Sequence, residues 1–70
     1  MRYFYEYKYK SGCIVGGHNL ENITIEGNKI ILAGVDIIST YYDKEYRGWT
    51  QVIVMNEIEY LKIEPMKEVG

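Results

Sequence analysis

Cysteine, histidine and proline each occur once in this 70-residue chain, and no apolar run approaches the length of a membrane span. A lone cysteine excludes an internal disulfide, and with no apolar leader it favours a reducing, cytoplasmic setting. A spanning helix would need about 20 consecutive apolar residues, so we expect no membrane partner. The single histidine has neither an HxxxH spacing nor a cysteine at ligand spacing, so we predict no metal site.

The patterns of known catalytic centres are also missing. Ser11 and Ser39 lie outside any nucleophile-elbow motif, and the spacing of Glu57 and Glu59 is typical of solvated strand-edge charges. The glycine pair at 16–17 lacks the following helix start and Lys-Ser/Thr pair of a phosphate-binding loop. A pocket of roughly 300 Å³ is hard to house in so small a domain, although an oligomer could form one between subunits. We therefore predict no enzymatic activity and no cofactor.

Charge is nearly balanced, with eight basic and ten acidic residues and a net charge of −2. Residues 1–10 carry three basic groups against one acidic group, and the remainder carries five against nine. A net negative charge opposes general affinity for nucleic acid or anionic membranes. The length predicts one domain with a thin core, which we place at residues 1–64, followed by a C-terminal tail at 65–70.

The chain is rich in β-branched and aromatic residues, including eight tyrosines. The densest apolar run spans residues 28–42, where apolar side chains occupy both alternation parities. This pattern predicts an interior strand, and its best partner is the run at 49–55. The polar stretch 43–48 ends in glycine and is predicted to be the loop between these two strands.

Gly34 interrupts the densest run and bears on which side chains point inward. Strict alternation would place Asp36 on the same face as Leu32, which would bury a charge. We therefore predict a bulge or bend at Ala33 and Gly34. Such a bend would turn Ile37 into the core and leave Asp36 outside.

Residues 2–10 alternate with period two, which predicts another strand. One of its faces carries four tyrosines. That face either packs on the thin core, with the hydroxyls at the rim, or forms an exposed platform for a base, a peptide strand or a second copy. We favour packing, because a thin core needs the aromatic area. The alternative binding site consists of Tyr3, Tyr5, Tyr7, Tyr9, Lys8 and Lys10.

The following segment contains several turn signals. Ser11 and Gly12 predict a turn, and residues 13–15 predict a short return strand that ends at the glycine pair. Cys13 is expected to be a small core residue. Residues 18–21 are predicted to be a loop or a single turn.

Residues 22–26 predict a strand, and Gly27 and Asn28 form the clearest two-residue hairpin loop in the chain. Pairing Glu26 with Lys29 fixes the register beyond the loop and sets opposite charges side by side. This register places four apolar residues on one face: Ile23, Ile25, Ile30 and Leu32.

Near the C-terminus, residues 56–59 predict a tight or 3₁₀ turn, and residues 60–63 predict a last short strand that Pro65 ends. The stretch TQVIVMNEIEYLKIEP resembles the last two strands of SH3-like and Sm-type small barrels. The resemblance covers roughly a quarter of the chain and lies in the apolar pattern. It implies an architecture and carries over no functional residue, because the Sm signature glycine and basic RNA-contacting residues are not present.

Aromatic residues and an arginine gather at the end of the hairpin formed by 28–42 and 49–55. They either cap the core or form an exposed tip, and aromatic residues with arginine are enriched in binding hot spots. We select this cluster as the candidate site for a protein partner. Its residues are Tyr41, Tyr42, Tyr46, Arg47 and Trp49.

The sequence therefore predicts an all-β fold of five to six strands, either a small, strongly twisted antiparallel sheet or an SH3/Sm-like barrel. The leading functional hypothesis is a non-enzymatic binding module for a macromolecular partner, of the kind that phages and mobile elements encode as regulators or inhibitors. A second hypothesis is a nucleic-acid or nucleotide binder that uses the tyrosine strand. A third is a structural subunit that forms homo-oligomers through its edge strands.

Overall fold

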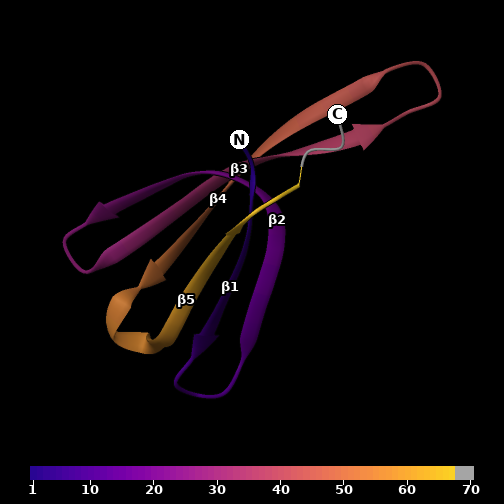
Figure 1. Cartoon of the computed structure of the whole chain (residues 1–70). Coiled ribbons are helices and arrows are strands. Elements are labelled where there is room, and N and C mark those ends of the chain that lie inside the picture. Colours follow the sequence, from indigo (N-terminus) through magenta and orange to yellow (C-terminus); the bar gives the residue numbers. More distant parts are fainter. Residues whose placement is uncertain (68–70) are drawn as a thin grey trace.

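The computed structural model of the protein describes residues 1–67, which form five strands and one 3₁₀ turn (Figure 1). The strands belong to one antiparallel sheet in the order β4-β3-β2-β1-β5. The elements are β1 (Tyr3–Tyr9), β2 (Ile14–Glu26), β3 (Lys29–Ser39), β4 (Lys44–Val54), η1 (Met55–Glu57) and β5 (Ile58–Pro65). The all-β prediction is confirmed. In residues 1–67 we find no helix with the length and apolar character needed to cross a membrane.

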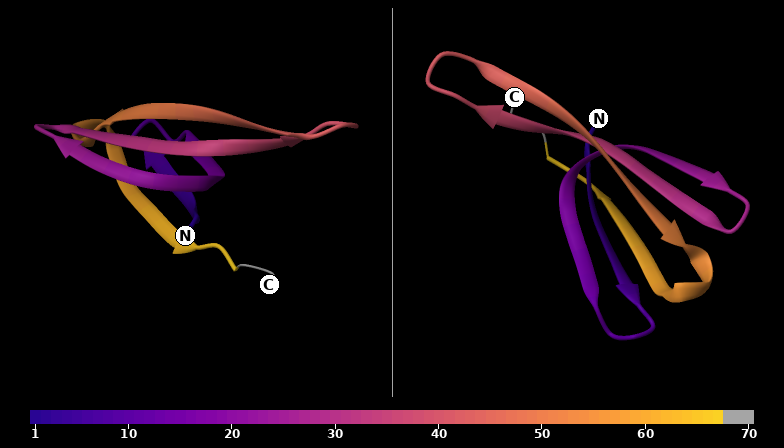
Figure 2. Two further views of the ribbon diagram at one scale, coloured as in Figure 1. Left: turned by 90° about the horizontal axis from the view of Figure 1, so that it is seen from above. Right: turned by 180° about the vertical axis from the view of Figure 1, so that it is seen from behind.

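The long strand β2 joins the two halves of the sheet. Its first part pairs with β1 as far as Leu20, opposite Tyr3, and its last part pairs with β3. The register slips between Leu20 and Asn22. Just before this slip, Asn19 has a φ of 63°, a left-handed conformation in which asparagine is enriched. An irregularity of this kind bends and twists a strand, and Figure 2 shows β1 and β5 on one side of the layer formed by β3 and β4.

Three predictions for the segment before this bend are wrong. Residues 18–21 are not a loop, because β2 continues through them, and Cys13 is exposed. The glycine pair does not end the strand: a Cβ atom on Gly17 would overlap the ring of Tyr5, so glycine here allows an aromatic side chain to lie against the backbone. Cys13 lies beside the turn at the start of β2, where Ile14 is also 60% exposed, and this end projects beyond the core.

The predicted bulge at Ala33 and Gly34 is also wrong. β3 pairs with β4 without a register shift from Lys29, opposite Val54, to Ser39, opposite Lys44. The irregularity lies instead on β2, across from Gly34. Asp36 is exposed as predicted, whereas Ile37 is only half-buried and lies outside the core cluster. Strict alternation leaves Asp36 in solvent because its part of β3 extends past the strands that cover the core.

The hairpin between β2 and β3 has the predicted register. Glu26 lies opposite Lys29, Ile25 opposite Ile30 and Ile23 opposite Leu32. Residues on the same face of this hairpin nevertheless differ in burial. Ile30 and Leu32 are buried, whereas Ile23 and Ile25 are exposed, because the pairing of β1 with β2 ends at Leu20.

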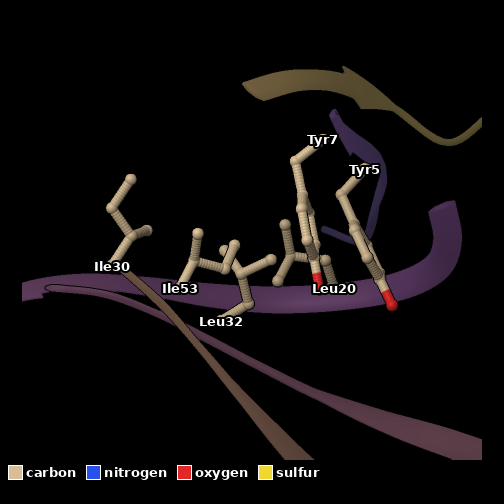
Figure 3. Packing of buried hydrophobic residues seen from close by; sticks show 6 residues of the cluster. All are labelled: Tyr5, Tyr7, Leu20, Ile30, Leu32 and Ile53. Atoms are coloured by element: carbon tan, nitrogen blue, oxygen red, sulfur yellow. The ribbon is translucent and has the colours of Figure 1, made fainter. Parts of the chain in front are cut away.

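The core lies between the two halves of the bent sheet. Leu20, Leu32 and Ile53 are at most 1% exposed, and half-buried side chains from β4 and β5 surround them. Figure 3 shows Tyr5 and Tyr7 side by side and directed toward β2, with ring centroids 6.2 Å apart and nearly parallel planes. The buried cluster consists of Tyr5, Tyr7, Leu20, Ile30, Leu32 and Ile53.

The sheet is open, because β4 and β5 form its two edges. The structure therefore corresponds to the predicted small twisted sheet and not to a closed barrel. The 3₁₀ turn η1 joins these edges close to the turn predicted at 56–59, but Ile58 and Glu59 already belong to β5. β5 ends at Pro65, and the Met66 N–H donates to the Arg2 carbonyl oxygen over 2.9 Å. The predicted tail 65–70 therefore begins attached to the sheet, and residues 68–70 lie outside the described part.

Candidate functional site

The ends of β3 and β4 project from the body of the molecule as a hairpin arm, which comprises residues 35–48 (Figure 1). The prediction that 43–48 is a loop is wrong. β4 begins at Lys44, so the connection contains only residues 40–43. The molecule measures 43 × 21 × 20 Å along its principal axes, and Figure 2 shows the arm extending along its length. The predicted aromatic tip therefore lies at the end of a paired β-hairpin that extends from the body of the molecule.

Four hydrogen bonds fix the turn at the end of the arm. The Thr40 N–H and hydroxyl donate to the Asp43 carbonyl oxygen over 2.7 and 2.6 Å, and the Asp43 N–H donates to the Thr40 hydroxyl over 3.0 Å. The Lys44 N–H donates to the Asp43 carboxylate over 2.7 Å. These bonds close the turn around the two residues between Thr40 and Asp43.

Those two residues are Tyr41 and Tyr42, which are 94% and 92% exposed. Their ring centroids lie 5.0 Å apart, and their planes meet at 80°, an edge-to-face arrangement that aromatic rings prefer. Two large aromatic side chains are thus held against each other at the tip of the arm with nearly all of their surface in solvent.

Tyr46 and Arg47 also lie on the arm, but on opposite faces of β4. Tyr46 is 63% exposed and pairs with Ile37 of β3. Arg47 lies opposite Asp36 in the register, and its guanidinium is 3.5 Å from the Glu45 carboxylate. Both members of this ion pair are more than half exposed, so the pair adds little to stability, and the guanidinium can take another partner at small cost.

Trp49 has a different environment from the other four predicted site residues. It is half-buried against the core, and its ring centroid lies 5.5 Å from that of Tyr5. A Cβ atom on Gly34 would overlap both the Trp49 indole and the Asn19 carbonyl oxygen. The predicted cluster is therefore divided, since Trp49 covers the end of the core while Tyr41, Tyr42, Tyr46 and Arg47 extend away from it.

The tyrosine strand, the alternative site, forms part of the core. Tyr5 and Tyr7 are 8% and 4% exposed, and Tyr3 and Tyr9 are half-buried beside them. Two of the hydroxyls share one amide. The Tyr7 hydroxyl donates to Gln51 Oε1 over 2.7 Å, and Gln51 Nε2 donates to the Tyr5 hydroxyl over 2.8 Å.

This packing changes the acidity of the Tyr7 phenol. It also leaves Tyr5 and Tyr7 with almost no exposed ring surface on which a base could stack. Burial, with the neighbouring Tyr9 as the next cause, raises the pKa of Tyr7 from 10.0 to about 12. Lys8 pairs with Glu59 over 3.5 Å, and Lys10 is exposed. The tyrosine rings and the two lysines therefore do not form one accessible surface.

The fold also brings together a set of residues that the sequence did not indicate. A hollow of about 330 Å³, larger than we expected in so small a domain, opens beside Trp49, and it is lined by Tyr5, Gly17, His18, Asp36, Trp49 and Gln51. The lining residues come from four different strands, β1 to β4, so no local spacing could have revealed the hollow. Within residues 1–67, no three His, Cys, Asp or Glu side chains gather as metal ligands would. Comparison with protein-family models, with curated proteins and with solved structures found no match to this chain.

Proposed function

We propose that the chain is a small non-enzymatic binding module that engages a protein partner through the tip of its hairpin arm. The observation that carries this proposal is the Tyr41–Tyr42 pair. Its rings are more than nine-tenths exposed, yet a hydrogen-bonded turn fixes their backbone and edge-to-face contact orients them. Such a pair offers a large contact area that is already arranged before binding.

Tyrosine suits this task for physical reasons. Its ring is rigid, so only two side-chain torsions lose freedom on binding, and the hydroxyl can hydrogen-bond at the edge of an interface. Tyrosine and arginine are also enriched among residues that dominate binding energy. Tyr46 and Arg47 lie on β4 directly behind the tip, where they extend the same projection along its two faces.

The exposed tyrosines of the arm do not contribute to the packing of the core. None of Tyr41, Tyr42 and Tyr46 belongs to the core cluster or to the half-buried shell that packs against it. An exposed aromatic cluster favours non-specific association and therefore lowers the solubility of the protein. A cluster that contributes no packing and carries this cost is best explained by contact with a partner.

Site-specific photocrosslinking tests the proposal. A photoreactive phenylalanine analogue replaces Tyr42 at the tip or, as the matched control, the exposed Lys62 on β5. Exposure to the native cell extract should give a discrete protein adduct at position 42 that is absent at position 62 and survives nuclease treatment. An adduct that requires nucleic acid would favour the nucleic-acid hypothesis instead.

The adduct then allows a quantitative measurement with the purified partner. The double variant Tyr41→Ser with Tyr42→Ser should weaken the complex by about 30-fold or more, the equivalent of about 2 kcal/mol. A matched variant at an exposed apolar residue far from the arm, Ile14→Ser, should bind normally. Unchanged affinity of the double variant would remove the tip as the binding site.

A further inference from the structure

The second half of β2 has a free edge. Residues 22–26 pair with β3 along one side, and on the other side β1 reaches only to Leu20. No strand within residues 1–67 pairs with this second side. An unpaired strand edge offers a row of backbone donors and acceptors to another chain.

The side chains on this edge continue the apolar face of the core. Ile23 and Ile25 are 44% and 64% exposed, and they lie directly opposite the buried Leu32 and Ile30. Residues 22–26 contain no lysine, proline or bulge to discourage pairing. The outer strand β5 is better protected, since it carries alternating charges and ends in Pro65. Residues 22–26 are therefore both apolar on one face and open along one side.

We propose that a second copy of this chain pairs with residues 22–26 as an antiparallel strand, around a two-fold axis at Thr24. In this register Ile23 lies opposite Ile25 of the second copy, and Asn22 lies opposite Glu26 of the second copy. The four isoleucines then form one apolar strip beside the two cores. No like charges face each other, because Glu26 meets an amide.

Backbone geometry selects this register. Glu26 and Lys29 flank a two-residue loop, so they form a hydrogen-bonded pair, and alternate residues of β2 then direct their backbone groups toward β3. Ile23 and Ile25 therefore direct theirs toward the free edge. The Thr24-centred register sets these outward groups opposite one another in both isoleucine pairs.

Other registers are worse for identifiable reasons. A shift by one residue would place outward groups opposite inward ones and would set isoleucines against the wrong face. Centring the axis on Ile25 would pair Ile23 with Gly27, and centring it on Ile23 would bring Ile25 against Glu21. Only the Thr24-centred register pairs all five residues of 22–26 with one another.

A cysteine at the axis tests the register directly. The two copies of Thr24 would form a non-hydrogen-bonded pair, with Cα atoms about 4.5 Å apart, which lies within the range for a disulfide. In a Cys13→Ser background, Thr24→Cys should form a disulfide-linked dimer under mild oxidation. The control Val52→Cys, on an exposed residue of β4, should remain mostly monomeric. Equal crosslinking of the two variants would overturn the proposal.

Mass measurement by light scattering or sedimentation tests the interface without a crosslink. The wild type should approach twice the monomer mass as its concentration rises from micromolar to millimolar. Ile25→Lys should remain monomeric with an unchanged circular-dichroism spectrum, whereas the matched variant Phe4→Lys, also on an exposed apolar residue, should still dimerise. A monomeric wild type, or a dimer that persists in Ile25→Lys, would overturn the proposal.

This dimer does not depend on the function proposed for the hairpin arm. The double variant Tyr41→Ser with Tyr42→Ser should dimerise like the wild type, since the arm and residues 22–26 lie at different ends of the sheet (Figure 1). Loss of the dimer in that variant would place the contact on the arm and would overturn the Thr24-centred model.

Discussion

β3 and β4 pair along eleven residues each, but the two ends of this ladder differ in environment. At one end, Ile30, Leu32 and Ile53 are buried in the core cluster together with side chains of β1 and Leu20 of β2. At the other end, the hairpin arm continues the same register with its side chains exposed or half-buried. Strand pairing is therefore equally regular in both regions, and only the cover provided by other strands distinguishes them.

The boundary between these regions lies at Gly34. On the core side the inward face carries isoleucine and leucine, and beyond Gly34 the same face carries Asp36 opposite Arg47. Trp49 lies over Gly34 at this point and contacts Tyr5. The arm can therefore change its sequence to suit a partner without altering the core, provided that the Trp49–Gly34 contact is kept.

The largest difference between the two regions should appear with truncation of a core side chain. Leu32 is completely buried, so Leu32→Ala should lower the free energy of unfolding by about 2–5 kcal/mol. Ile37→Ala in the arm should cost only about 1 kcal/mol, because Ile37 is half-buried and outside the cluster. Urea unfolding monitored by circular dichroism measures both, and equal losses would contradict the comparison.

Truncation of Trp49 to alanine should lower the free energy of unfolding as truncation of a core residue does. A fully buried tryptophan costs about 3–5 kcal/mol when truncated to alanine, and the half-buried Trp49 should cost about 3 kcal/mol or somewhat less. Thermal unfolding measures the loss, with Tyr46→Ala as the exposed control on the same strand. A loss near zero would mean that Trp49 belongs functionally to the arm.

A methyl group at the boundary should also destabilise the fold. Gly34→Ala would push its Cβ atom into the Asn19 carbonyl oxygen and the Trp49 indole. Backbone and ring must then shift, which should cost about 1–3 kcal/mol and change the tryptophan fluorescence. Gly48→Ala is the matched control, because its Cβ atom would meet only an atom at ordinary contact distance. Similar behaviour of the two variants would show that the boundary is not tightly packed.

The buried phenol of Tyr7 should make stability fall at high pH. Its pKa is raised from 10.0 to about 12 in the folded protein, so the folded state holds the proton more tightly than the unfolded chain. The stabilisation of the folded state that comes from the protonated Tyr7 phenol is fully present below pH 10, and it is lost as the pH rises from 10 toward 12. Tyr7→Phe should therefore show a shallower decline over this range in unfolding experiments at a series of pH values.

At neutral pH the same variant should cost about 1 kcal/mol, because Gln51 Oε1 loses its donor. Tyr46→Phe is a suitable control, since Tyr46 is 63% exposed and lies on the hairpin arm, outside the core cluster. A decline with pH that is as steep in Tyr7→Phe as in the wild type would contradict the assignment to Tyr7.

The smallest effect on stability is expected at the tip of the arm. Tyr41→Ser with Tyr42→Ser should change the free energy of unfolding by less than about 0.5 kcal/mol, because both side chains are almost fully exposed. Chemical denaturation should give overlapping curves for this variant and the wild type. A loss of 2 kcal/mol or more would mean that the arm supports the fold, and it would weaken the case for a binding role.

Local patterns predicted much of the strand ladder. Alternation identified β1, and the Gly27–Asn28 loop gave the register of β2 and β3 residue by residue. Both are properties of neighbouring residues, because alternation follows from the pleat and a two-residue loop fixes which residues oppose each other. The turn before β5 and the end of β5 at Pro65 were predicted for the same reason.

The candidate site was only partly predictable. The aromatic composition of residues 41–49 drew attention to the hairpin end, but turn residues and glycine suggested a loop where β4 continues as a strand. Strand pairing with β3 overrode that local preference. The division of the cluster between Trp49 and the arm depends on Tyr5 and Gly34, which are distant in the sequence.

Local patterns of residues were enough to establish the fold class, most strand positions and the pairing across the Gly27–Asn28 loop. They did not show which of the paired residues are buried, because burial requires a second layer whose extent depends on the bend in β2 and on where β1 ends. Ile25 and Ile30 illustrate this difference, since they lie directly opposite each other and yet are 64% and 8% exposed. Pairing is a local property of two strands, whereas cover depends on the path of the whole chain.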